Sequence, residues 1–283
     1  MKYLNLGCGQ RFHSAWTNID FVSCGEGVIA HNLLNGIPFP DNEFDFVYHS
    51  HVLEHFEKED GLFFIKECYR VLKHGGIIRI AVPDLEQIVK KYLISMEDAL
   101  AGDSESAHNY EWMMLEMYDQ TVRNQSGGNM AKYFYKDEIP NERFVFSRVG
   151  QEGIQIREKF LKSKSKSEKS EYVFKKESIL KRMFNPNLYL LKLKKIFLNN
   201  EIKRINEQMH YTELGKFRLS GEIHQWMYDR YSLNKVLKEC GFSDVKVLAA
   251  FDSVIPEWNS YELDSKDGTV FKPDSLFVEA IKK

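Results

Sequence analysis

The sequence has few cysteines, few prolines and no long apolar run. Among 283 residues there are seven prolines and four cysteines, and the cysteines follow no C-x-x-C spacing. A disulfide framework or a zinc ribbon is therefore not expected, and we predict reduced thiols. No apolar segment approaches the roughly 20 residues that span a bilayer, and no signal-peptide pattern opens the chain. We expect a cytoplasmic protein without a transmembrane segment.

The net charge of -2 hides a basic segment in the second half of the chain. Residues 157–204 hold 15 Lys/Arg and 5 Asp/Glu, a net of +10, so the rest sums to -12. Within it, Lys162–Ser167 has no apolar face and predicts a mobile basic loop near 157–170. Leu188–Ile205 predicts an amphipathic helix, which is either solvated and packed on its own domain or a patch for a lipid or an acidic ligand. Weak peripheral membrane contact through 157–204 therefore stays open.

A glycine turn near the start of the chain marks the predicted ligand site. Tyr3–Leu6 predicts a short buried strand, and Gly7-Cys8-Gly9 ends it, because glycine allows the backbone to turn sharply against a ligand. Trp16–Ile19 predicts a second strand, which Asp20 closes. A carboxylate at this place accepts hydrogen bonds from the two hydroxyls of a ribose. Nicotinamide enzymes have a third glycine and about 20 residues before the acid, and this chain has neither.

Strands alternate with helices through residue 84. Phe44–Ser50 and Ile77–Val82 predict strands, and Gly61–Leu72 has helical apolar spacing. We expect His74-Gly75-Gly76 to end that helix. His51–Phe56 opens a further helix-like stretch. The alternation predicts a parallel sheet with crossover helices.

The regular pattern returns from residue 221. Tyr231–Cys240 predicts a helix, and Val245–Phe251 and Ser275–Ile281 predict strands that pair antiparallel at one sheet edge. The predicted architecture is one α/β domain, residues 1–95 plus 220–283. A largely helical insertion, residues 96–219, interrupts it before the last two strands, as an acceptor-binding part or a lid.

Several motifs resemble a known family. They are LNLGCG, NID, HNLLNGIPFPDNEFDFVYHSHVLEHF and ECYRVLKHGGIIRIAVPD, with weaker ones in 221–281. The chain resembles class I S-adenosylmethionine-dependent methyltransferases, in particular the type-11 group of polysaccharide-biosynthesis clusters. The resemblance implies a Rossmann-like seven-stranded sheet in the order 3-2-1-4-5-7-6, mostly parallel, with S-adenosyl-L-methionine as cofactor. It also implies O-methylation of a sugar or glycan intermediate, free or lipid-linked.

The resemblance implies cofactor contacts along one sheet edge. The glycine turn would face the methionine part, Asp20 the ribose and Asn32-Leu33 the adenine. Asn32 and Asn5 stand where many members have an acid, and an amide oxygen can still accept a hydrogen bond. The implied cofactor-binding residues are Asn5, Gly7, Cys8, Gly9, Asp20, Asn32, Leu33, Ser50 and His51.

A hydroxyl acceptor needs a base whose pKa lies near neutrality. His51, just past a strand end, is the first candidate, although it could instead cap a helix or pack on the cofactor. His224 is the second, and with Trp226, Tyr228 and Tyr231 it forms either the floor of a sugar pocket or core. Asp84 is a base, an acceptor ligand or a helix cap.

His51–His55 also fits H-x-x-E-H, a zinc-protease pattern with two ligands one helical turn apart. A strand is predicted to end at Ser50, so His51 would lie in the first turn only, and we expect no metal. Glu54 and His55 are then expected to be structural. Two alternatives to the enzyme stay open: this zinc hydrolase, and a non-catalytic cofactor-binding scaffold of a glycan-assembly complex. No nucleic-acid partner is expected, because the chain is acidic overall and lacks the Asn-Pro-Pro-Tyr type of motif used on flipped bases.

Overall fold

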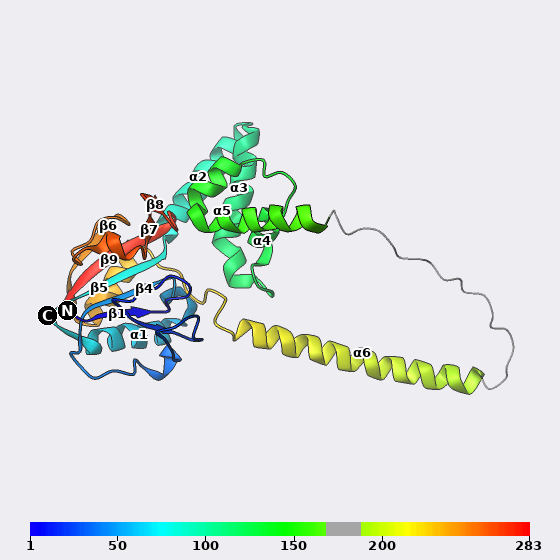
Figure 1. The fold of residues 1–283 in the computed structure, drawn as a ribbon. Helices are drawn as coiled ribbons and strands as arrows, with labels where there is room; N and C mark the ends of the chain where they lie inside the picture. The colour runs from blue at the N-terminus through cyan, green and yellow to red at the C-terminus, as the bar shows by residue number, and fades with distance from the viewer. Residues whose placement is uncertain (168–187) are drawn as a thin grey trace.

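A seven-stranded sheet with the order β3-β2-β1-β4-β5-β9-β6 is the centre of the computed structural model (Figure 1). The structure describes residues 1–167 and 188–283, without the side chains of 165–167, 188–200, 202 and 203. The strands are β1 (Tyr3–Leu6), β2 (Thr17–Asp20), β3 (Val28–Ala30), β4 (Phe44–Ser50), β5 (Leu72–Pro83), β6 (Phe242–Leu248) and β9 (Ser275–Lys282), and a separate hairpin joins β7 (Ser265–Lys266) to β8 (Thr269–Val270).

The predicted strand order is confirmed, with β9 as the antiparallel strand. β1 to β5 pair parallel, so their carboxyl ends share one edge of the sheet. β9 runs in the opposite direction between β5 and β6, and Pro83 at the end of β5 pairs with Ser275 at the start of β9. The first residues of β9 therefore lie at the edge where the parallel strands end, which is where such sheets bind ligands.

The two faces of the sheet pack against different apolar clusters. On one face lie α1 (Lys58–Val71) and α7 (Arg230–Glu239), whose buried Phe64, Ile65 and Leu233 join the main apolar cluster. On the other face lies a second apolar cluster, which contains Trp16, Tyr48 and Trp258.

Arg79 of β5 is fully buried beside the second cluster. Its guanidinium bonds to Asp264 and Glu279 at 2.9 and 2.8 Å and lies 4.4 Å from the centre of the Trp258 ring. This network ties β5 and β9 to the segment that precedes β7.

The helical insertion before the last two strands is present. It consists of α2 (Leu85–Leu100), α3 (Ser104–Val122), α4 (Gly128–Phe134), α5 (Glu142–Ser167) and α6 (Leu188–Arg218). Helices α2 to α5 gather beyond one end of the sheet (Figure 1). They have their own apolar cluster around Trp112 and Met113, and Arg148 of α5 pairs with Glu116 of α3 at 2.8 Å.

The basic stretch after residue 157 is helical where the structure describes it. α5 continues to Ser167, so the mobile loop predicted for Lys162–Ser167 is wrong there, and 168–170 lie outside the described residues. The alternating Lys and Ser side chains are compatible with a solvated helix, since Ser163 donates back to the Phe160 carbonyl and Lys162 pairs with Glu158 one turn earlier.

α6 projects away from the sheet and from the other helices (Figure 1). The side chains of 204–213 are exposed, and most of the predicted amphipathic face of 188–205 lies outside the described side chains. Within the described part of the chain, no helix is both long enough and apolar enough to cross a membrane.

Two predicted boundaries near the site differ from the structure. α1 ends at Val71, before His74-Gly75-Gly76, and these residues lie inside β5. They belong to a bulge, because residues 73–76 of β5 stand opposite the single residue Asp45 of β4. The helix-like stretch His51–Phe56 forms only a 3₁₀ turn, Leu53–His55.

Candidate active site

The glycine turn is held against the end of β2. Gly7 has φ of 65°, and a Cβ there would lie 2.3 Å from a methyl group of Val52, so a side chain does not fit. The amides of Gly7 and Cys8 donate to the Ile19 carbonyl at 2.8 and 3.1 Å. The amide of Gly9 donates to Asp20 Oδ2 at 2.7 Å. Asp20 therefore fixes the shape of the turn.

A cavity of about 740 Å³ lies against this turn. Among the predicted cofactor and catalytic residues, those that line it are Asn5, Gly7, Cys8, Gly9, Ser50, His51 and His224. Asn5 is almost fully buried, and its amide donates to the Arg11 carbonyl and to Asn18, so it also holds the loop after the turn.

Four predicted site residues do not line this cavity: Asp20, Asn32, Leu33 and Asp84. Asp20 ends β2 beside Ala30, the last residue of β3, and Asn32 follows soon after. Asn32 caps a 3₁₀ turn by accepting from the Leu34 amide, and Leu33 is buried. A cofactor that extends from the turn across β2 would reach these residues, and their role stays a prediction.

Asp84 takes the capping role among the three roles considered. Its carboxylate accepts from the amides of Glu86 and Gln87 as the N-cap of α2. Of the aromatic residues predicted near His224, Tyr228 is buried in the sheet core and Tyr231 is exposed. Neither of them lines the cavity, nor does Trp226.

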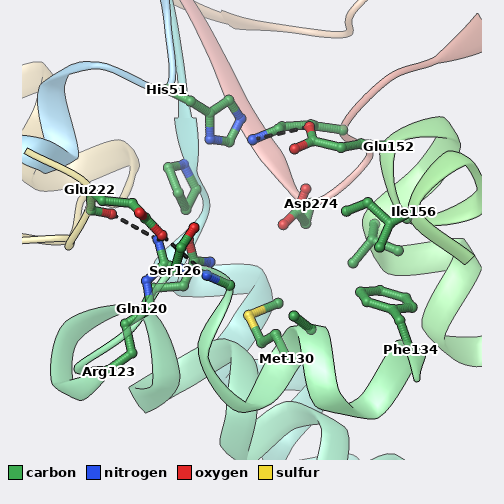
Figure 2. Close-up of a pocket in the computed structure, with 16 residues that line it drawn as sticks. His51, Gln120, Arg123, Ser126, Met130, Phe134, Glu152, Ile156, Glu222 and Asp274 are labelled. Carbon is green, nitrogen blue, oxygen red and sulfur yellow. Dashed lines mark hydrogen bonds and ion pairs between the residues drawn. The ribbon is translucent and has the colours of Figure 1, made fainter. Parts of the chain in front are cut away.

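A second cavity of about 290 Å³, shown in Figure 2, shares several lining residues with the first. Its apolar wall comes from Met130 and Phe134 of α4 and Ile156 of α5, and its polar groups include Asp274 and Ser126. The residues that line both cavities are His51, Gln120, Arg123, Glu152, Ile156, Glu222 and Lys272.

His51 lines both cavities, and each of its ring nitrogens has a polar neighbour. Its φ of 55° is unusual for a non-glycine residue, and its Nε2 lies 2.8 Å from Ser275 Oγ. Its Nδ1 lies 3.0 Å from Oε1 of Glu54, which is fully buried. Burial, together with the cationic Lys272, holds the pKa of His51 well below its usual range. The imidazole is therefore neutral at pH 7, and in this ligand-free arrangement it is a weaker base than a solvent-exposed histidine.

Glu54, expected to be structural, is close to both His51 and His55. Burial raises the pKa of its carboxyl to about 8. His55 and His224 meet edge to face, with ring centres 4.8 Å apart. Burial lowers the pKa of His55 to about 4 and that of His224 well below its usual range. The H-x-x-E-H segment forms only the 3₁₀ turn Leu53–His55 and no α-helix, so His51 and His55 are not separated by one α-helical turn.

Several charged residues of the site had not been predicted. Lys272 pairs with Glu152 at 3.3 Å, and Arg123 pairs with Glu222 at 3.4 Å (Figure 2). Asp274 points into the second cavity, and its Oδ1 is buried without a hydrogen-bond partner. Burial and the nearby Glu116 raise the pKa of Asp274 to about 6. The sequence did contain a signal for Asp274. Because the last strand was predicted to run antiparallel, the residue just before it is expected at the edge where the parallel strands end.

Residues 23–80, from the loop after β2 into β5, match the family described as a methyltransferase domain. Together with the strand order of the sheet, this match decides the assignment. The chain carries a class I S-adenosylmethionine-dependent methyltransferase domain. The cofactor of such a domain is S-adenosyl-L-methionine, and the cavity against the glycine turn of this methyltransferase domain is in the place where the fold binds ligands.

Solved methyltransferase structures resemble the chain only distantly. A SAM-dependent methyltransferase from Archaeoglobus fulgidus is 14% identical over 99% of this chain and 86% of its own, with a TM-score of 0.37. One from Thermotoga maritima is 11% identical over 100% and 82%, with a TM-score of 0.38. A Galdieria sulphuraria protein assigned as a sarcosine dimethylglycine methyltransferase is 23% identical over 28% of this chain, with a TM-score of 0.24.

That last match spans only 38% of the Galdieria protein. No curated protein matches the chain. Similarity at this level indicates nothing about the acceptor of the methyltransferase domain.

Proposed function

We propose that this protein transfers a methyl group from S-adenosyl-L-methionine to a hydroxyl of a sugar or glycan intermediate. The observation that carries the proposal is the position of His51. It lines both the cavity against the glycine turn and the second, smaller cavity, and Figure 2 shows it in the second. A donor in the first cavity and an acceptor in the second would meet at this side chain.

The bound cofactor supplies an activated methyl group, so the protein has mainly to align donor and acceptor. His51 is the proposed base. With its hydrogen on Nδ1 facing Glu54, its Nε2 is a proton acceptor, and Ser275 Oγ is the partner of that atom when no acceptor is bound. The acceptor hydroxyl replaces Ser275 as this partner and passes its proton to Nε2. Glu54 is the proposed positioning residue, because its Oε1 lies 3.0 Å from Nδ1 and a nearby carboxylate favours the tautomer with the hydrogen on that nitrogen.

The lining of the second cavity supports a sugar as the acceptor. One side is apolar, with Phe134, Met130 and Ile156, and the other presents the carboxylate of Asp274 (Figure 2). A sugar ring has the matching character, with an apolar face and hydroxyls at its edge. The unpartnered Oδ1 of Asp274 would accept from such a hydroxyl. The volume of about 290 Å³ lies near the lower end of ligand pockets, roughly 300–1,000 Å³.

We also propose a division of labour along the chain. Residues 1–95 and 220–283 would bind the cofactor, and 96–219 would supply the acceptor site, since Phe134, Met130 and Ile156 come from α4 and α5. The proposed location is the cytoplasm, in keeping with four free thiols. Polysaccharide biosynthesis is the proposed setting, with acceptors that are either free or lipid-linked. In the second case, the basic segment 157–204 would make weak contact with the membrane.

A labelled-methyl uptake screen with nucleotide sugars, short glycans and lipid-linked glycans tests the proposal. We expect S-adenosylhomocysteine to form only with one acceptor class. His51→Gln should lower turnover about 10²- to 10⁴-fold while cofactor affinity stays within a few-fold. The matched control is His74→Ala, which removes an exposed histidine of β5 and should leave turnover unchanged.

Two outcomes would overturn the proposal. Full turnover by His51→Gln would remove His51 as the base. Cofactor binding without product for any acceptor would favour the non-catalytic scaffold over the enzyme.

A further inference from the structure

Three side chains that can bind a metal ion lie close together near His51. Glu54 and His55 belong to the 3₁₀ turn after β4, and His224 belongs to the segment between α6 and α7. One ligand atom from each lies within 4.8 Å of the others. The backbone fixes the two segments together, because the amides of Gln225 and Trp226 donate to the Glu54 carbonyl at 2.8 and 3.2 Å.

The Glu54 carboxylate has no partner that explains its burial. The residue is fully buried, and neither carboxylate oxygen has a hydrogen-bond partner. His51 Nδ1 lies 3.0 Å from Oε1 but without the geometry of a hydrogen bond. Buried carboxylates in folded proteins are paired, hydrogen-bonded or bound to metal ions. Such an unpartnered group facing two imidazoles indicates a missing cation.

The two histidines are oriented as ligands of one ion. His55 Nδ1 lies 3.2 Å from the Ile223 carbonyl, which fixes the hydrogen on that nitrogen and leaves Nε2 free. The His224 ring is buried, and no described residue hydrogen-bonds to it. The two rings are nearly perpendicular, at 88°. Two imidazoles and one carboxylate are a donor set of catalytic zinc sites with an open position.

We propose that Glu54, His55 and His224 bind one divalent transition-metal ion, with zinc as the preferred ion. Bonds of about 2.0–2.2 Å put tetrahedral ligand atoms roughly 3.3 Å apart, so the side chains would close by about 1 Å around the ion. Its fourth position faces the larger cavity, because His55 and His224 line that cavity. A water or an acceptor oxygen occupies it there.

This site differs from the pairing that the H-x-x-E-H spacing suggests. His51 bonds to Ser275 and stays outside the ligand set, and His224 comes from far along the chain. The proposal that a metal ion binds here does not depend on the proposed methyl transfer. Only the suggestion that an acceptor oxygen is the fourth ligand depends on it. A competing cluster exists at Cys8, Asp20 and Cys24, so the experiment has to separate the two.

The test uses the full-length protein freed of metal with a chelator. Zn²⁺ is titrated by calorimetry, and Co²⁺ is used as a spectroscopic probe. We expect one ion per chain and the visible bands of tetrahedral Co²⁺, without the near-ultraviolet charge-transfer band of thiolate ligands. Glu54→Gln and His224→Ala should each weaken binding at least 10-fold. His210→Ala, at an exposed position of α6, and Cys24→Ser should bind like the wild type.

Circular dichroism of each metal-free variant checks that it is folded, and Glu54→Gln keeps the shape of the side chain. Equal Zn²⁺ affinity of Glu54→Gln and wild type would overturn the proposal. A thiolate band that disappears in Cys24→Ser would do the same, by placing the ion at the cysteine cluster. Methyl transfer by a protein that binds no metal would remove the metal site alone. Stoichiometric metal without methyl transfer would instead speak against the proposed function.

Discussion

Among single residues, His49 gives the most direct link between burial and pH. It lies on the central strand β4, fully buried against Phe64, and neither ring nitrogen has a hydrogen-bond partner. Burial lowers its pKa from 6.5 to about 3. Between these values the unfolded chain binds the proton and the folded chain does not, so stability is present above pH 6.5 and is lost as the pH falls.

We expect His49→Leu to remove this loss. The difference in unfolding free energy between variant and wild type should change in favour of the variant by roughly 2 kcal/mol between pH 7 and pH 5. Urea denaturation at the two pH values measures it. Because the other buried histidines and carboxyls are the same in both proteins, their contributions cancel in the difference. A difference that does not depend on pH would mean that His49 takes up a proton in the folded state.

Asp20 is expected to act in two ways, through the glycine turn and through the ribose. Asp20→Ala removes the acceptor for the Gly9 amide and, if the predicted ribose contact is right, both ribose bonds, so it should weaken cofactor binding about 100-fold or more. Asp20→Asn keeps an acceptor for Gly9 but loses the charge and one ribose bond, so a loss of about 10-fold is expected. Isothermal titration with S-adenosylhomocysteine measures both. Unchanged affinity in Asp20→Ala would contradict the ribose assignment.

The sequence allowed part of the site to be predicted, and the reason differs between residues. Local rules located the glycine turn and His51, because a turn after a strand and a residue past a strand end can be identified within a few positions. Glu54 was expected to be structural, since its role depends on partners distant in sequence. Its backbone contacts the segment that carries His224, which follows the whole helical insertion. No local spacing reports such a contact.

Among the elements, the kink of α5 connects the helical insertion with the sheet. Gly150 has φ of 58°, and a Cβ there would lie 2.5 Å from Pro273 and 2.6 Å from the Phe271 carbonyl. Beyond the kink, Glu152 reaches Lys272 and Ile156 lines both cavities. This close approach positions α5 at the site.

Gly150→Ala should therefore lower the unfolding free energy by about 2 kcal/mol or more, from backbone strain and overpacking. It should also weaken cofactor binding, because Glu152 and Lys272 line the same cavity. Denaturant titration and calorimetric binding measure the two effects. The control is Gly215→Ala in α6, where a Cβ meets nothing within 4 Å, and this change should be neutral or stabilising by up to about 1 kcal/mol. Equal unfolding free energies of the two variants would show that residues 270–273 can move away from the added methyl group without loss of stability.

Element types were easier to predict than element ends. Continuous apolar runs such as Ile77–Val82 identify strands that are covered on both faces, and their alternation with helices predicted parallel pairing. The order of the strands was implied by the resemblance to the methyltransferase family and not by the alternation. The bulge at 73–76 depends on a neighbouring strand, so glycines that suggested a helix end belong to β5. Lys162–Ser167 lacks an apolar face, yet its backbone continues α5.

In the whole molecule, the sheet and the helical insertion have separate apolar clusters. The main cluster covers one face of the sheet, and another lies among α2 to α5 around Trp112. The larger cavity is lined by the glycine turn on one side and by α3 and α5 on the other, through Gln120 and Glu152. Without ligand, we expect the full chain to unfold over a broad range, with a calorimetric enthalpy above the van't Hoff value.

Saturating S-adenosylhomocysteine should change this behaviour, because the cavity that it is expected to occupy is lined by the glycine turn and also by α3 and α5. At 100 times its dissociation constant a ligand adds about 2.7 kcal/mol to the folded state, so the whole transition should sharpen and move to higher temperature. Differential scanning calorimetry with and without the compound measures this, and Asp20→Ala, with its reduced affinity, should show a much smaller shift. A ligand shift confined to one part of a split transition would mean that α3 and α5 take no part in holding the cofactor. The acceptor site would then have to close over it only when the acceptor itself arrives.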